Sequence, residues 1–308
     1  MMRKLLFISL SLIFFSCSSS YEISEQSIAN HLSTLASDAH EGRNTGTPGI
    51  EKSAVYIEKI FRENGLKPFY ETYRDSFQVS PGLIGYNLIA YKEGIDENLK
   101  DDLIIIGAHY DHIGVQEEGE DKIANGANDN ASGTVSVVEL AKYFAKKKTK
   151  RSILFVLFSA EEMGLIGSKH LAKRMSAEKQ NIYTLLNIEM VGVPLESQPY
   201  SAYLTGFDKS NMAERFNNFT RKNTFGYFEK AAEYQLFMRS DNYPFYQEMN
   251  IPAQTLCTFD FSNYPYYHHV DDEFELMDIQ HMQSLISEIA TGIEKMVNEP
   301  ENSIQLNE

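Results

Sequence analysis

Ile153-Leu154-Phe155-Val156-Leu157-Phe158-Ser159 forms an apolar run that ends just before the acidic pair Glu161-Glu162. A strand with one solvated face alternates apolar and polar residues, whereas this run has no polar residue before Ser159. The run therefore predicts a strand that is covered on both faces. Strands of this kind occur in the middle of parallel sheets flanked by helices.

Further apolar runs of strand length alternate with amphipathic segments of helix length. The expected strands are residues 86–91, 103–108, 184–190 and 253–258, and the expected helices are residues 24–37, 50–64, 133–146, 165–174, 209–222 and 277–297. Residues 40–49 are rich in turn formers and predict a loop. This alternation predicts an α/β protein, a three-layer α/β/α sandwich with a mixed, largely parallel central sheet.

The ends of the chain differ from this pattern. Arg3-Lys4, an apolar run over residues 5–15 and the sequence Ser16-Cys17 resemble a bacterial lipoprotein signal. We therefore expect a signal peptide over residues 1–16, a tether over 17–23, one folded domain over 24–298 and a dispensable tail over 299–308. The expected location is the cell envelope, at the outer membrane or in the periplasm, through a lipid on Cys17. An ordinary secreted product is the alternative.

Charge and cysteine content restrict the partners. The formal net charge of −15 disfavours nucleic acid and anionic lipid surfaces, so the only membrane contact that we expect is the anchor. Cys257 is the only other cysteine, which excludes a disulfide within the mature chain. It ends an apolar segment and is expected to be a buried small residue. The sequence does not indicate an oligomeric state.

Side chains that can bind metals follow three of the expected strands. His109 follows residues 103–108, Glu161-Glu162 follow the run at 153–159, and Glu189 lies near the end of residues 184–190. Ligands in open α/β sheets bind at the carboxyl ends of strands. The three strand ends therefore predict one shared site.

Other residues near these strand ends have two interpretations. Asp129 lies in a loop of small residues before the helix at 133–146, where it either caps the helix or approaches a cation. Adjacent strand residues point in opposite directions, so Glu161 and Glu162 are expected to have different roles. The same alternation places Asp111 on the side of His109, where it would orient the imidazole.

Four motifs together resemble the co-catalytic zinc aminopeptidases, a family that includes secreted leucine aminopeptidases, glutamate carboxypeptidase and the transferrin receptor ectodomain. They are His109-Tyr110-Asp111, Asn128-Asp129-Asn130, Glu161-Glu162 followed by Met163-Gly164, and Tyr267-His268 before Asp271-Asp272. The resemblance implies His109 and Glu189 on one zinc, Glu162 and His268 on the other, and Asp129 bridging. It implies Glu161 as general base, and His269 as the alternative to His268.

The chain departs from this family pattern at two places. Glu189 stands where the family usually has aspartate, which leaves a one-zinc enzyme possible beside the expected two zincs. Ser240-Asp241-Asn242 replaces serine-aspartate-histidine in a segment expected to line the substrate pocket, with Arg239 and Asp241 as contacts. The aromatic residues of this half either form a pocket or belong to the core: Phe225, Tyr227, Phe228, Phe237, Tyr264 and Tyr266.

The resemblance implies a zinc-dependent exopeptidase, an aminopeptidase that hydrolyses peptides with metal-activated water and a glutamate base. Carboxypeptidase and dipeptidase activities stay open. A glutaminyl-peptide cyclotransferase with one zinc is the first alternative, although its pocket is typically rich in tryptophan and this chain has none. The second alternative is a peptide-binding relative without catalysis.

Overall fold

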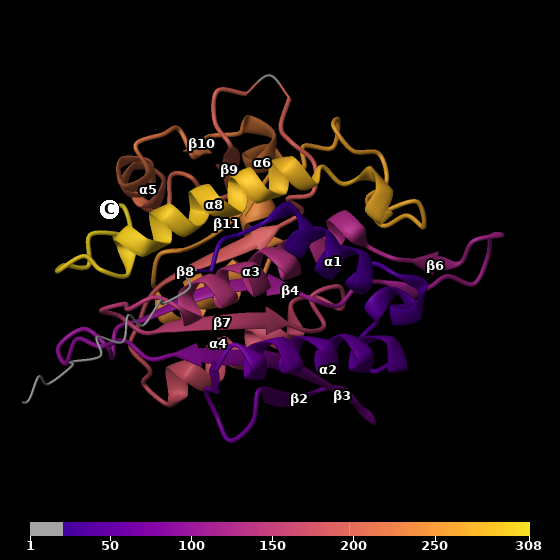
Figure 1. Ribbon diagram of the computed structural model, residues 1–308, viewed down its shortest axis with the longest axis horizontal. Helices are drawn as coiled ribbons and strands as arrows, with labels where there is room; N and C mark the ends of the chain where they lie inside the picture. Colours follow the sequence, from indigo (N-terminus) through magenta and orange to yellow (C-terminus); the bar gives the residue numbers. More distant parts are fainter. Residues whose placement is uncertain (1–20, 197) are drawn as a thin grey trace, which may run out of the picture.

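The computed structural model describes residues 21–196 and 198–308, so the expected signal peptide and Cys17 lie outside the described residues. A nine-stranded mixed sheet forms the centre of the protein (Figure 1). Its order is β1-β3-β7-β4-β8-β11-β9-β10, and β2 pairs with β3. The strands are β1 Lys67–Pro68, β2 Arg74–Ser80, β3 Leu83–Lys92, β4 Leu103–His109, β7 Ile153–Phe158, β8 Ile182–Glu189, β9 Ala202–Leu204, β10 Phe225–Gly226 and β11 Ala253–Cys257.

The four central strands are parallel, and their register aligns their carboxyl ends. β7, β4, β8 and β11 run in one direction, while β3 is antiparallel to β7 and β9 is antiparallel to β11. His109 pairs with Phe158, and Cys257 pairs with Glu189. The last residues of the four strands therefore meet at one edge of the sheet. A separate hairpin consists of β5 Gly114–Val115 and β6 Ile123–Ala124.

Helices cover both faces of the sheet, as the apolar run at 153–159 predicted. Ile104 and Phe155 belong to a large core beneath one set of helices, while their neighbours Ile105 and Leu154 belong to a smaller core on the other face. The first set is α1 Glu25–Leu35, α2 Pro48–Glu63, α3 Gly133–Ala145, α5 Met212–Thr220 and α8 Ile279–Met296; the second is α4 Ile166–Ala177 and α7 Asn242–Met249. In Figure 1, α1, α3 and α8 lie together in front of the sheet. The predicted three-layer fold is confirmed.

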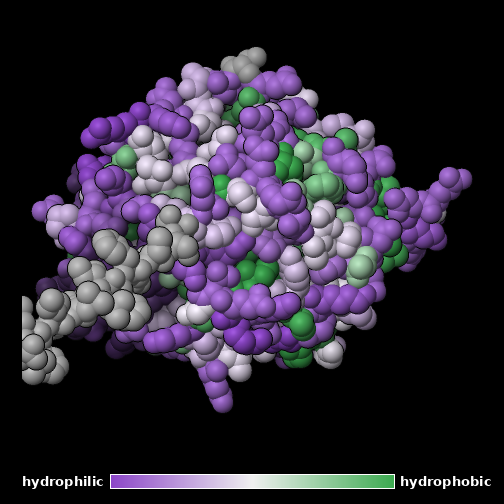
Figure 2. All heavy atoms as spheres, in the orientation of Figure 1, coloured by the Kyte–Doolittle hydropathy of each residue, from purple (hydrophilic) through white to green (hydrophobic). Residues whose placement is uncertain are grey.

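Several elements, most of them short, were not predicted. They are β1, β2, β5, β6, β9, β10, the five-residue helix α6 Glu229–Glu233, α7, and the short helical segments η1 Asp38–Arg43, η2 Ala127–Ser132, η3 Leu236–Met238 and η4 Phe274–Leu276. Most of these elements are too short to show a hydrophobic period, and α7 contains Pro244. No helix among the described residues is long and apolar enough to span a bilayer. The face in Figure 2 is largely hydrophilic, with its hydrophobic side chains in small separate groups.

The segment after residue 298, which the sequence led us to expect to be dispensable, packs against the domain. Ile304 is 2% exposed, and Leu306 forms a β-bridge with Ser210. The guanidinium of the buried Arg151 donates to the side chain of Asn302. The end of the expected tether is also packed, since Ile23 is 4% exposed.

We expect Ile304→Ala to lower the free energy of unfolding by about 2–4 kcal/mol, because it empties a buried site. Deletion of residues 300–308 should lower it at least as much, since it also removes the Asn302 partner of Arg151. Urea unfolding followed by circular dichroism measures both effects. Ile95→Ala is the matched control, because Ile95 is 59% exposed and should change stability by about 0.5 kcal/mol at most. A deletion with the wild-type midpoint would contradict the role of the tail.

Candidate metal centre

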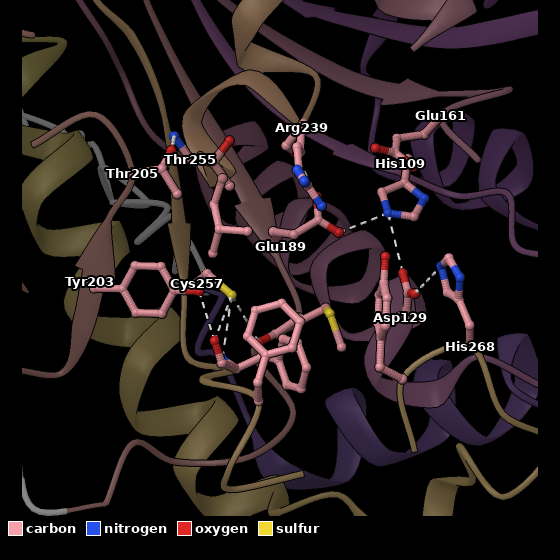
Figure 3. A pocket seen from close by; sticks show the side chains of 16 residues that line it. His109, Asp129, Glu161, Glu189, Tyr203, Thr205, Arg239, Thr255, Cys257 and His268 are labelled. Atoms are coloured by element: carbon pink, nitrogen blue, oxygen red, sulfur yellow. Dashed lines mark hydrogen bonds and ion pairs between the residues drawn. The ribbon is translucent and has the colours of Figure 1, made fainter. Parts of the chain in front are cut away.

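Five candidate ligands meet at the edge where the parallel strands end. His109 ends β4 and Glu189 ends β8, while Glu162 follows β7 after a short turn. Asp129 comes from the turn η2 before α3, and His268 comes from the loop after β11. Figure 3 shows Asp129 between His109 and His268, with Glu189 on the other side of His109. Residues separated by 159 positions in the chain are therefore neighbours in space.

The first cluster consists of His109, Asp129 and Glu189. The Nε2 atom of His109 lies 2.8 Å from Glu189 Oε1 and 3.5 Å from Asp129 Oδ1. Its Nδ1 lies 3.1 Å from the backbone oxygen of Asp111, which can only accept a hydrogen bond. The proton of a neutral His109 is thereby assigned to Nδ1, and the Nε2 lone pair faces the two carboxylates. This tautomer suits a metal ligand.

The second cluster uses the other oxygen of Asp129. His268 Nε2 lies 3.2 Å from Asp129 Oδ2 and 3.0 Å from Glu162 Oε2. His269, the alternative considered from the sequence, lies instead against Asp271 at 3.4 Å. The two oxygens of Asp129 thus face different imidazoles, which is the arrangement that a bridging carboxylate requires.

The donor set fits two divalent cations. Each cluster offers imidazole nitrogen and carboxylate oxygen, the ligands that zinc takes in catalytic sites. Asp129 Oδ2 is buried and accepts no hydrogen bond from the described residues. Burial opposes protonation of both imidazoles, but Glu189 and Glu161 raise the pKa of His109 well above its ordinary value, and Asp129 and Glu162 raise that of His268 to about 10. The carboxylates therefore draw positive charge to the place where cations would bind.

The longer side chain of Glu189 is accommodated in the first cluster. While Oε1 approaches His109, Oε2 accepts a 2.7 Å hydrogen bond from the hydroxyl of Ser240. Ser240 belongs to the serine-aspartate-asparagine segment that departs from the family pattern. The additional methylene is therefore compatible with a three-residue cluster at this position.

Glu161 and Glu162 diverge as expected, but strand alternation is not the reason. β7 already ends at Phe158, and Ala160 turns the chain with a φ of 56°. Glu161 lines the pocket, whereas Glu162 faces the second cluster. Burial, together with Asp241 and Glu189, raises the pKa of Glu161 well above its ordinary value, although His109 opposes the shift.

Asp111 contacts His109 less closely than the sequence predicted. β4 ends at His109, so no strand alternation aims the Asp111 carboxylate, which lies 3.7 Å from His109 Nδ1. The carboxylate instead accepts hydrogen bonds from the backbone N–H groups of Glu161 and Glu162, at 3.2 and 3.4 Å. Asp111 therefore orients His109 through its backbone carbonyl and fixes the glutamate turn through its side chain.

A pocket of ≈ 660 Å³, including space open to solvent, adjoins the metal centre. Arg239 lines it, as the sequence predicted, and forms no ion pair with any described residue. Asp241 does not line it, and its side chain is fully buried. The aromatic lining also differs from the six residues considered from the sequence, since Tyr203, Phe259, Phe261 and Tyr267 form it.

Arg43 is a site residue that the sequence analysis missed. It is 1% exposed, and its guanidinium donates to the backbone oxygens of Leu35, Tyr110, Asn125 and Gly126 at 2.6–3.0 Å. These bonds join the loop after β4 to the loop that leads to Asp129. Burial lowers the pKa of Arg43 to about 10, against the effect of Asp272 and Asp129, so it stays charged at neutral pH. No pattern in residues 40–49 pointed to this contact.

We expect Arg43→Met to lower the free energy of unfolding of the metal-free protein by about 3 kcal/mol or more. Each buried carbonyl left without its donor costs about 1–3 kcal/mol. Urea unfolding measures this loss, with the exposed Arg62→Met as the control that should stay within about 0.5 kcal/mol of wild type. Equal midpoints for the two variants would show that the four hydrogen bonds do not stabilise the loops.

We expect Asp241→Asn to stabilise the chelator-treated protein more at pH 8 than at pH 5. Burial raises the pKa of Asp241 from 3.8 to about 7, although His109 opposes the shift, and its oxygens accept no hydrogen bond from the described residues. Ionisation of Asp241 therefore lowers the free energy of unfolding. The penalty is absent below pH 3.8, grows between pH 3.8 and about pH 7, and is complete above that, on the order of a few kcal/mol. Thermal unfolding at both pH values measures the difference.

The exposed Asp101→Asn is the matched control for Asp241→Asn and should show little dependence on pH. An effect of Asp241→Asn that is equal at pH 5 and pH 8 would contradict a raised pKa.

Curated relatives of the chain include peptidases. It is 31% identical over 193 residues to leupeptin-inactivating enzyme 1 of Streptomyces exfoliatus, covering 62% of this chain and 39% of that protein. It is 25% identical over 273 residues to a probable leucine aminopeptidase of Trichophyton verrucosum, covering 84% of this chain and 68% of the relative. The chain thus spans well under half of the first relative and about two thirds of the second.

Solved structures show the same fold. An aminopeptidase from Aneurinibacillus sp. strain AM-1 matches with a TM-score of 0.71 at 17% identity, covering 94% of this chain and 98% of that one. Glutaminyl cyclase from Porphyromonas gingivalis matches with a TM-score of 0.69 at 15% identity, covering 89% and 99%. The model of peptidase family M28 matches residues 87–293, which is more than half of the chain. With the candidate metal centre inside the matched region, the chain belongs to peptidase family M28.

Proposed function

We propose that this protein is a zinc-dependent aminopeptidase with two zinc ions per chain. The observation that carries the proposal is that Asp129 faces two imidazoles, His109 with Glu189 beside it and His268 with Glu162 beside it. His109 and Glu189 would hold one zinc, Glu162 and His268 would hold the other, and Asp129 would bridge them. Membership of peptidase family M28 and the aminopeptidase relatives support this assignment.

Zinc bound at this centre would polarise a peptide carbonyl and lower the pKa of water from about 15.7 to near 7. Glu161 is the proposed general base, because it lines the pocket beside the clusters and has no ligand role in either of them. It would take a proton from the attacking water and pass it to the leaving nitrogen. Asp111 would hold the Glu161 backbone in place through its 3.2 Å hydrogen bond.

The pocket favours an apolar residue at the N-terminus of the peptide. Figure 3 shows Tyr203 and Cys257 on the side of the pocket away from His109, Asp129 and His268. Leu236, Phe259 and Phe261 add apolar surface. An aliphatic or aromatic side chain placed there would bury its surface while its peptide bond lies at the metal centre. Arg239 would contact a substrate carbonyl or carboxylate at the rim.

The likeness to a glutaminyl cyclase structure supports one alternative, a glutaminyl-peptide cyclotransferase with one zinc. Two observations favour the aminopeptidase. The chain has no tryptophan, and its two clusters provide ligands for two metals. A lipid anchor at Cys17 in the cell envelope also remains a proposal, which the sequence of residues 1–17 alone supports.

We expect Glu161→Gln to lower kcat for leucine p-nitroanilide by about 10²- to 10⁴-fold while its zinc content stays at the wild-type value, because only proton transfer is lost. The measurement is steady-state hydrolysis with elemental analysis of the same samples. Glu229→Gln, at an exposed position on α6, is the matched control and should keep full activity.

The same preparation discriminates the alternatives. Acetyl-leucine p-nitroanilide should not be hydrolysed if a free N-terminus is required. Cyclisation of an N-terminal glutamine without hydrolysis of any aminoacyl-nitroanilide would establish the cyclotransferase instead. If the zinc-loaded wild-type protein had neither activity, the remaining alternative would be a peptide-binding relative without catalysis.

A further inference from the structure

A third histidine, His112, lies in the metal centre, and neither the sequence motifs nor the proposed ligand set uses it. Its side chain is 0% exposed, and its Nδ1 lies 2.9 Å from Glu162 Oε1. The ring is 5.8 Å from that of His268 in an edge-on arrangement. Glu162 is therefore contacted by an imidazole on each of its two oxygens, by His112 at Oε1 and by His268 at Oε2.

The chemistry of the pair assigns the proton. An ionised carboxylate only accepts hydrogen bonds, so the Nδ1 of His112 must be the donor. The other ring nitrogen, Nε2, is buried and has no hydrogen-bond partner among the described residues. An unpaired lone pair there costs less than an unpaired buried N–H would. The ring therefore donates from Nδ1 to Glu162 Oε1, and Oε2 of Glu162 faces the second cluster.

The space that holds this ring is built into the backbone. Gly126 has a φ of 57°, and a Cβ atom at this position would lie 2.5 Å from Cδ2 of His112. The backbone N–H of His112 donates to the carbonyl of Arg43, whose guanidinium donates in turn to the carbonyl of Gly126. The backbone of His112 and the Gly126 loop that packs against its ring are thus both held by Arg43.

A direct ligand role for His112 fits the distances less well. Its Nδ1 is close enough to Asp129 and Glu162 to form a three-residue cluster with them. However, it lies 3.8 Å from Asp129 Oδ2, whereas His268 Nε2 lies 3.2 Å from the same oxygen. Its contact with Glu162 has the length of an ordinary hydrogen bond.

We propose that His112 is a positioning residue of the second metal site, which holds Glu162 Oε1 by an Nδ1–H hydrogen bond so that Oε2 alone is presented to the metal. The inference rests on the proposed function, because it assigns Glu162 to the second zinc. A carboxylate held in this way loses less freedom when the metal binds, and contacts of this type change metal affinity by about 10- to 100-fold.

The test compares His112→Leu with His112→Asn. The leucine variant fills the space but has no donor, whereas the Nδ2 of asparagine can replace the Nδ1 of histidine. We expect the leucine variant to bind the second zinc equivalent about 10- to 100-fold more weakly, and the asparagine variant to stay within about threefold of wild type. Competition with a chromophoric chelator measures both zinc equivalents, and the visible spectrum of the Co²⁺-loaded protein reports the ligand geometry.

His40→Leu is the matched control, because His40 is also buried and its Nδ1 bonds to the hydroxyl of Ser53, away from the ligands. It is expected to change stability and not second-metal affinity. The proposal would be overturned if both His112 variants bound the second zinc as tightly as wild type. An equal loss of affinity in both variants would also overturn it, because the imidazole itself would then be a ligand. Either result would concern only the role of His112 and would leave the proposed peptidase function standing. A wild-type protein that binds no second zinc equivalent would contradict the proposed metal centre as well.

Discussion

Four carboxylates, from Asp129, Glu161, Glu162 and Glu189, converge on one partly buried edge of the sheet, and their mutual repulsion is the constraint on which the rest of the centre depends. Desolvation makes such an accumulation costly unless positive charge compensates it. The raised pKa values of His109 and His268 favour their protonated forms, which supply part of that charge, and the buried Arg43 supplies a further cation. Two divalent cations would compensate the charge more completely, and they would release the imidazole protons when they bind.

Arg43 connects this electrostatic constraint to the fold. Its guanidinium donates only to backbone carbonyls, one at the end of α1 and three in the two loops beside the site. The first loop follows His109 and carries Asp111 and His112, and the second leads to Asp129. A single buried residue from the segment before α2 therefore positions ligands from two other parts of the chain. The scaffold and the centre are stabilised by the same contacts.

The central strands and the site residues at their ends could be predicted from the sequence because both follow from local rules. An apolar run such as 153–158 has to be covered on both faces, and the ends of parallel strands have to share an edge. The residues that sequence reasoning missed lie in loops, where side-chain direction depends on tertiary contacts. Nothing local distinguishes the buried His112 from the exposed His269, or the pocket residue Phe259 from the core residue Phe225. The packed tail was missed for the same reason, since Ile304 is a single apolar residue without a period.

The central claim is that the shared Asp129 joins two metal sites, and its most direct test is the zinc stoichiometry of the wild-type protein. Chelator-treated protein would be titrated with zinc while bound metal and leucine p-nitroanilide hydrolysis are followed together. The account predicts two equivalents per chain, with full activity restored only when both are bound. Saturation at one equivalent with full peptidase activity, or no zinc binding at all, would contradict it.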